Sequence, residues 1–349
     1  MTKMISTCWI GSSYTRTRLC LRQRILIEQR SWFRKISRKT ERVEAEVWRN
    51  SGSRNSIAEP TSFSRGSILR NLYKPFLFTV GFSGCSFGAA AIWQYESLKN
   101  RMKNYLDDMR ADWLERIQPA KHGDFRKQVN EWWNSLSDGQ KTVSGIIAAN
   151  ILVFCCWRVP SIQRIMVRYF TSNPASNNLC LPMILSTFSH FSLFHMAANM
   201  YVLWTFSSSI VSILGQEQFL ALYMSAGVVS TFASYVCKAA TGRFGPSLGA
   251  SGAIMTILAV VCTKMPEAKL AIIFLPMFTF TAGNALKVII SLDSMGLLLG
   301  WNFFDHAAHL GGALLGIWYA LYGHELIWKK REPLVKIWHE FRSNPPRSG

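Results

Sequence analysis

Two polar side chains stand out within the apolar part of this sequence, Ser251 and His309. Ser251 lies in the small-residue stretch Gly249-Ala250-Ser251-Gly252 at the head of one membrane-length apolar segment, and His309 lies in the middle of the last such segment. Ionisable groups inside a membrane helix are costly and usually serve a function. A serine beside a histidine has the chemistry of a nucleophile with its general base. The pair therefore predicts hydrolysis of a peptide bond within a lipid bilayer.

The stretch around Ser251 predicts a loop that leads into a helix. At a helix start the backbone N–H groups are unpaired, so they could donate to an oxyanion formed at a carbonyl that Ser251 attacks. The alternative is that Ser251 only caps the helix among packing glycines. The G-x-S-x-G elbow of another hydrolase fold is excluded, because position 253 is Ala.

The segment of His309 carries glycines on the same predicted helix face. Gly312 and Gly316 follow the histidine at +3 and +7, positions that share one side of a helix. A glycine face allows tight helix packing, which would place His309 against the helix of Ser251. A buried structural histidine is the alternative.

A third pair of polar residues lies near the head of another apolar segment. His195 and Asn199 are spaced i and i+4 and therefore share a helix face. Both can donate hydrogen bonds, and donors aimed at developing negative charge contribute strongly to catalysis. An interhelical polar clamp is the alternative.

The distribution of apolar segments predicts an all-α polytopic membrane protein with a six-helix core and one extra N-terminal transmembrane helix. The core spans are expected near 142–158, 192–214, 217–238, 250–265, 269–290 and 305–323. The extra helix contains Gly84-x-x-x-Gly88, a spacing that permits close helix contact. The chain divides into a basic N-terminal region, the extra helix, a polar linker, the core and a basic C-terminal tail, at 1–73, 74–96, 97–141, 142–323 and 324–349.

Composition and charge agree with that class. Of 349 residues, 49% are hydrophobic and 17% charged, with a net charge of +19. Residues 1–73 hold fifteen Lys and Arg against five Asp and Glu. Nucleic-acid binding is disfavoured, because the basic part is a tail and most of the remainder suits lipid. Residues 1–27 contain no acid and are rich in Arg and Ser, which is typical of a mitochondrial transit peptide; a basic tail that contacts anionic lipid is the alternative.

Together, G-x-S-G at 249–252, H-x-x-x-N at 195–199 and A-H-x-x-G at 308–312 resemble the rhomboid intramembrane serine proteases over about residues 142–323. The extra helix and the transit-like tail resemble the mitochondrial branch of that family. The resemblance implies Ser251 as nucleophile and His309 as base. It also implies His195, Asn199 and the Ser251 backbone N–H as oxyanion donors. Neither metal nor cofactor is implied.

By the same resemblance, the protein would be a multi-pass protein of the mitochondrial inner membrane. Its substrates would be single-pass or tail-anchored membrane proteins of mitochondrial quality control and apoptosis signalling, and it could work as a homo-oligomer or in a scaffold complex. The alternative function is a catalytically weak rhomboid-like protein that binds transmembrane helices. A channel or transporter is disfavoured, because few charged residues are found along the spans.

Two positions bear on how His309 is oriented. Many bacterial rhomboids carry Tyr four residues after the nucleophile, where this chain has Met255. A thioether stacks less rigidly than an aromatic ring, so turnover is expected to be slow. Asp305 lies four residues before His309 and is the carboxylate that the sequence offers for a triad, although the family uses a dyad.

Overall fold

The computed structural model describes residues 72–111, 124–272, 275–301 and 304–343, and nearly all of them are helical. The predicted transit region lies outside these residues. Five helices are long and apolar enough to cross a membrane by length and composition: α3 (Tyr73–Ala111), α5 (Asp138–Cys156), α8 (Leu193–Leu214), α9 (Gln216–Thr241) and α11 (Ala282–Leu299). A shorter apolar helix, α10, covers Ser251–Lys264, and α12 (His306–Trp318) runs on as the π-helix η4 (Tyr319–Trp328). The all-α polytopic class is confirmed.

The remaining elements are short. They are α4 (Asp124–Ser135), η2 (Pro160–Ile162), α6 (Gln163–Tyr169), α7 (Cys180–Leu185), η3 (Ser186–Phe188), β1 (Lys269–Ile272), β2 (Leu275–Thr281), η5 (Lys329–Arg331) and α13 (Glu332–Ser343). Four of them, from η2 to η3, fill the stretch before α8 that is too polar and too rich in proline to span a membrane.

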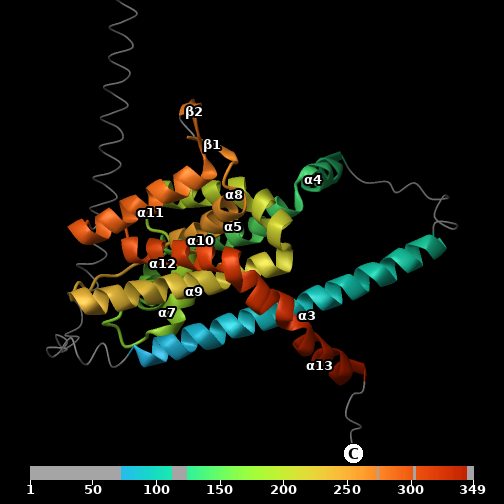
Figure 1. The fold of residues 1–349 in the computed structure, drawn as a ribbon, viewed down its shortest axis with the longest axis horizontal. Coiled ribbons are helices and arrows are strands. Elements are labelled where there is room, and N and C mark those ends of the chain that lie inside the picture. The colour runs from blue at the N-terminus through green and yellow to red at the C-terminus, as the bar shows by residue number, and fades with distance from the viewer. Residues whose placement is uncertain (1–71, 112–123, 273–274, 302–303, 344–349) are drawn as a thin grey trace, which may run out of the picture. The chain divides into compact units, whose positions relative to one another are not determined.

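Helix α10 is the centre of the core. It packs against α8, α9, α11 and α12, and Figure 1 shows it among these neighbours. Ten of the eleven residues from Gly252 to Cys262, all except Met255, are buried. A helix that is apolar on all sides is stable only when other elements surround it. Its inner position explains why α10 can be shorter than the five helices of membrane-crossing length.

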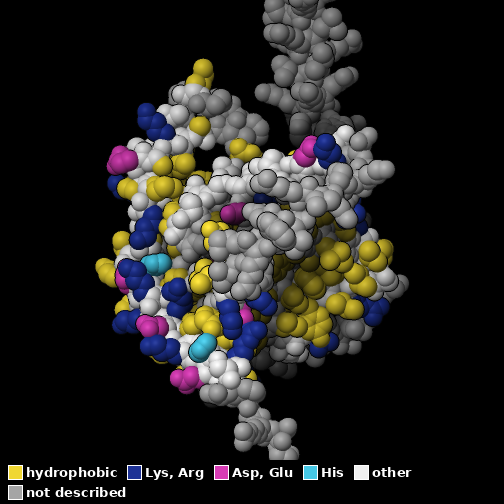
Figure 2. Space-filling view, turned by 90° about the vertical axis from the view of Figure 1, so that its right-hand side faces the viewer, with side chains coloured by type: hydrophobic (Ala, Val, Ile, Leu, Met, Phe, Trp, Pro, Cys, Tyr) yellow, Lys and Arg dark blue, Asp and Glu magenta, His cyan; other side chains and the backbone are white. Residues whose placement is uncertain are grey.

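The outer helices instead present apolar side chains to their surroundings. Leu77 on α3 and Leu298 on α11 are 62% and 86% exposed. Hydrophobic side chains also gather over a broad area on the face drawn in Figure 2. Large exposed apolar areas are unusual on a water-soluble monomer, and they suit a protein surrounded by lipid.

Helices α10 and α12 approach each other closely through glycine. A Cβ on Gly312 would collide with the carbonyl oxygen of Gly252, and one on Gly316 would collide with the carbonyl oxygen of Thr256. The Thr256 hydroxyl donates a hydrogen bond of 2.8 Å to the carbonyl oxygen of Gly312. The two helix backbones are therefore in direct contact.

Helix α3 differs from the expected extra span in length and packing. It continues to Ala111, into the segment expected to be linker. It packs on α9, where the rings of Phe76 and Phe232 lie 5.8 Å apart. A Cβ at Gly84 would meet nothing within 4 Å, and one at Gly88 would only touch the Leu334 side chain at 3.5 Å. The GxxxG spacing therefore does not mark a close helix contact here.

The span expected at 269–290 is wrong in its first half. Residues 269–272 and 275–281 form the antiparallel strands β1 and β2, and α11 begins only at Ala282. A continuous apolar run cannot by itself distinguish strand from helix. Alternating Phe and Thr around Phe278–Thr281 suit a strand, and the Thr281 side chain then caps α11.

The first core helix begins earlier than expected. α5 starts at Asp138 because Ser137 and Gln140 form a reciprocal capping box at its N-terminus. The Ser137 hydroxyl accepts from the Gln140 N–H, and the Gln140 side chain accepts from the Ser137 N–H. This pairing satisfies two N–H groups that a helix start leaves open.

The glycine contact between α10 and α12 predicts a difference between two Gly→Ala variants. In an exposed helix position Ala is favoured over Gly by up to about 1 kcal/mol, and Gly84→Ala should keep or raise thermal stability. Gly312→Ala should instead lower stability by about 1–3 kcal/mol, the usual cost of overpacking. Thermal unfolding of both variants in the same detergent checks this. Equal midpoints would show that α10 and α12 can separate without cost.

Candidate active site

Ser251 is the first residue of α10, and the turn before it is fixed by backbone hydrogen bonds. Ser172 and Ser247 exchange two of them, at 2.8 and 2.9 Å, and the N–H of Gly249 donates to the carbonyl oxygen of Ser186 at 2.9 Å. Gly249 has φ of +129°, a conformation that favours glycine. The N-cap residue is Ala250, without a side-chain hydrogen bond to the helix. Ser251 is therefore not the cap that the alternative interpretation required.

His309 lies on α12 directly opposite Ser251. Its Nε2 atom is 2.9 Å from the Ser251 hydroxyl oxygen, although the two residues are 58 positions apart in the sequence. The imidazole is buried, with 7% of the residue exposed. The close α10–α12 packing through Gly312 and Gly316 brings the two side chains together. The distance suits direct proton transfer between hydroxyl and ring.

A carboxylate that the sequence analysis did not single out contacts the other side of the His309 ring. Asp293 on α11 places Oδ1 3.1 Å from Nδ1 of His309 and 2.7 Å from Nδ1 of His306. All three residues are buried. The expected span ended at 290, so Asp293 was assigned to a loop. An acidic residue inside an apolar helix is the signal that could have found it.

Asp305, the carboxylate that the sequence offered for a triad, makes its side-chain contacts with residues other than His309. It caps α12 by accepting from the Ala308 N–H at 3.1 Å and pairs with Lys238 at 3.2 Å. It also accepts from the hydroxyls of Ser234 and Ser247, both at 2.5 Å. Asp305 therefore ties the start of α12 to α9 and to the turn that precedes Ser251, and the suggestion that it completes a triad is wrong.

His195 lies beside the turn before Ser251. A Cβ built on Gly249 would be 3.0 Å from Cε1 of His195 and 3.8 Å from the Ser251 hydroxyl oxygen. The imidazole and the hydroxyl thus both lie close to the Cβ position of the same glycine. Any larger residue at position 249 would occupy the space between them.

Asn199 reaches the start of α10 through a second histidine. Its side-chain N–H donates to Nε2 of His190 at 3.0 Å, and the Ala250 N–H donates to the same nitrogen at 3.4 Å. Two N–H donors on Nε2 mean that His190 carries its proton on Nδ1. His190 is fully buried, and sequence reasoning did not select it.

Burial and, to a smaller extent, the neighbouring His195 lower the pKa of His190 to about 3. The ring is therefore neutral in the folded protein at any physiological pH. A neutral ring keeps the lone pair on Nε2 that both donors require.

One group of side chains among the described residues could in principle hold a metal ion. Asp293, His306 and His309 each offer a ligand atom, and these atoms lie within 4.8 Å of one another. The same atoms are engaged in the hydrogen bonds between the three side chains. The expectation that neither metal nor cofactor takes part stays a prediction.

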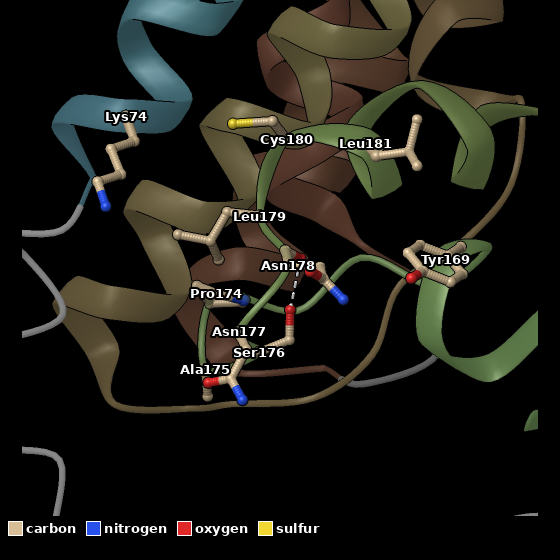
Figure 3. A pocket seen from close by; sticks show the side chains of 10 residues that line it. All are labelled: Lys74, Tyr169, Pro174, Ala175, Ser176, Asn177, Asn178, Leu179, Cys180 and Leu181. Atoms are coloured by element: carbon tan, nitrogen blue, oxygen red, sulfur yellow. Dashed lines mark hydrogen bonds between the residues drawn. The ribbon is translucent and has the colours of Figure 1, made fainter. Parts of the chain in front are cut away.

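A pocket of about 420 Å³ lies elsewhere, between the start of α3 and the loop before α7 (Figure 3). Lys74, Tyr169 and Cys180 are among its lining residues, and neither Ser251 nor His309 is. Burial raises the pKa of the Cys180 thiol, so this cysteine is not an activated nucleophile. The pocket is separate from the candidate active site.

The chain is similar to known proteins over the segments that contain these residues. The model of the rhomboid domain matches residues 178–326, a range that contains Ser251, His309, His195 and Asn199. The mitochondrial presenilin-associated rhomboid-like protein of Bos taurus is 68% identical over 327 residues, covering 93% of this chain and 87% of the bovine chain. The chain belongs to the rhomboid family.

Two further relatives bear on the place of the chain within the rhomboid family. The human presenilin-associated rhomboid-like protein, also mitochondrial, is 68% identical over 329 residues, with 93% of this chain and 87% of the human chain covered. Mitochondrial rhomboid protein 1 of Saccharomyces cerevisiae is 32% identical over 192 residues, which are 54% of this chain and 55% of the yeast chain. With its apolar helices, this rhomboid is a multi-pass mitochondrial membrane protein.

The position of His190 predicts how two replacements differ. His190→Phe keeps a buried ring but leaves the Asn199 and Ala250 N–H groups without their acceptor. Each buried donor left unpaired costs about 1–3 kcal/mol, so thermal stability should fall. His190→Gln offers an amide oxygen and should recover part of the loss. Thermal unfolding in detergent checks the order, and equal stability of the two variants would mean that these hydrogen bonds do not hold the turn.

Proposed function

We propose that this rhomboid is an intramembrane serine protease, with Ser251 as nucleophile and His309 as general base. The observation that carries the proposal is the 2.9 Å contact between Nε2 of His309 and the Ser251 hydroxyl. His309 is buried, and Ser251 is half-buried at the start of the central helix α10. The alternative, a catalytically weak protein that only binds transmembrane helices, would not require this contact.

The proposed reaction has two stages. The Ser251 oxygen attacks the carbonyl carbon of the scissile bond while its proton passes to Nε2 of His309. When the C–N bond breaks, His309 returns that proton to the leaving amine. Water then attacks the acyl ester with His309 again as base, which releases the second product and restores the serine.

The oxyanion that forms during the attack needs hydrogen-bond donors. The start of α10 supplies backbone N–H groups at Ser251, where no side chain caps the helix. The His195 ring and the Ser251 hydroxyl both lie near the position that a Cβ on Gly249 would take. Asn199 donates one side-chain N–H to His190 and has a second N–H to offer. We assign these three residues as the oxyanion donors of the proposed site.

The proposed substrates follow from the surroundings of the site. A helical substrate has its carbonyls hydrogen-bonded, so cleavage requires a segment weakened by residues such as Gly or Pro. We propose single-pass or tail-anchored proteins of the mitochondrial inner membrane as substrates, with quality control and apoptosis signalling as the processes served. A homo-oligomer or a scaffold complex is compatible with this function.

The proposed roles of Ser251 and His309 are tested by single and double replacement. Ser251→Ala and His309→Ala should each abolish cleavage of a membrane-anchored substrate in liposomes. Residues that act as a unit are not additive, so the double variant should be no worse than either single one. Ser212→Ala removes an exposed serine from α8 and should cut at the wild-type rate. Substantial turnover by either single variant would contradict the assignment.

The oxyanion assignment is tested separately. Asn199→Ala should lower turnover about 10²-fold, as loss of one donor does in other hydrolases. Covalent labelling of Ser251 by a fluorophosphonate should persist, because the serine and its base remain. Asn284→Ala, at an exposed position of α11, is the matched control. If Asn199→Ala and His195→Ala both cut at the wild-type rate, the two residues only support the fold.

A further inference from the structure

Asp293 is a buried carboxylate that a serine–histidine dyad does not need. It lies on the apolar helix α11 and is 7% exposed. Its Oδ1 atom is 2.7 Å from Nδ1 of His306 and 3.1 Å from Nδ1 of His309. An ionised carboxylate can only accept hydrogen bonds, so each ring donates an Nδ1–H to it. His309 is thereby held with the lone pair of Nε2 toward Ser251.

Helix α11 is also shaped to receive the second histidine. Gly296 follows Asp293 by three residues, so both lie on one face of the helix. A Cβ on Gly296 would be 2.5 Å from Nε2 and 2.6 Å from Cε1 of His306. The carboxylate and the missing side chain together form a seat for the His306 ring. The His306 ring held there bonds Oδ1 of Asp293 and so restrains the carboxylate.

The His306 ring carries an unusual feature inside this seat. Its Nε2 atom is buried and has no hydrogen-bond partner among the described residues. The ring centroids of Trp301 and Phe304 lie 6.2 and 6.3 Å from the centroid of the His306 ring. Leaving a buried polar atom unpaired costs stability, and each such case calls for an explanation. A role for His306 in holding the carboxylate supplies one.

We propose that Asp293 is a positioning residue for the proposed protease and that His306 anchors it, an inference that rests on the proposed function. When His309 takes the Ser251 proton, the adjacent carboxylate stabilises the positive ring, and the effect is larger in a medium of low dielectric constant. Asp293 accepts no proton itself. It fixes the tautomer and orientation of His309. This chain has Met255 where an aromatic ring could otherwise orient the histidine by stacking.

Kinetics of the full-length protein in liposomes test this inference. Asp293→Asn keeps the size of the side chain and removes its charge. We expect kcat to fall about 10²–10⁴-fold, as for the equivalent change in other serine proteases, while KM stays within about threefold because Asp293 does not contact substrate. The rate of fluorophosphonate labelling should fall in parallel. Asp293→Glu, which restores the charge, should recover part of kcat.

Two further variants separate positioning from folding. Asp305→Asn removes the charge of a half-buried carboxylate at the start of α12, which pairs with Lys238. It should lower thermal stability and leave kcat within about tenfold of wild type, well above Asp293→Asn. In Gly296→Ala, the alanine suits a helix better than glycine does, but its Cβ displaces the His306 ring. It should lower kcat about 10–100-fold, since a shift of about 1 Å can cost 10²-fold, and it keeps the test available if Asp293→Asn does not fold.

The outcomes distinguish this inference from the proposed function. Wild-type kcat in both Asp293→Asn and Gly296→Ala would overturn the positioning role while leaving the protease assignment intact. Loss of wild-type activity on addition of a chelator would also overturn it, because the three side chains would then be metal ligands. A wild-type protein that neither cleaves substrate nor reacts with the fluorophosphonate would contradict the proposed function instead.

Discussion

The direct backbone contact between α10 and α12 determines the geometry of the candidate site. Gly312 and Gly316 leave no room for side chains between the two helices, because a Cβ on either would collide with a carbonyl oxygen of α10. The Thr256 hydroxyl also donates a hydrogen bond to α12 across this contact. Because α10 begins at Ser251 and α12 contains His309, the same contact sets the distance between hydroxyl and imidazole. The reactive pair therefore depends on helix packing. A change in the spacing of α10 and α12 would change the distance between the Ser251 hydroxyl and the His309 ring.

Around this contact, polar groups are paired through residues from several helices. Lys238 of α9, the turn at Ser247 and the cap of α12 meet at Asp305. On the other side, Asn199 of α8 and the start of α10 share His190. An unpaired polar group in an apolar interior is expensive, so each network constrains where its helices can lie. Together they hold the turn before Ser251 from two directions.

The sequence was sufficient to predict which segments meet where residue type and spacing both carried information. A serine among small residues, a histidine followed by glycines and an i, i+4 polar pair indicated segments that the structure brings together. The sequence was insufficient where a long apolar run had no internal marker. The strands β1 and β2 were predicted as helix for that reason. Because the predicted span ended at residue 290, Asp293 was placed outside the helix that carries it. Contacts between distant segments, such as those of His190 and Asp305, follow from packing and have no local signature.

The central claim is that Ser251 is made reactive by His309, and mapping a covalent adduct tests it most directly. The membrane-embedded protein would be treated with a fluorophosphonate, digested and examined by mass spectrometry. We expect a phosphonyl group on Ser251 in the wild type and none on that residue in His309→Ala. An adduct on a different serine, or equal modification of Ser251 without the histidine, would contradict it.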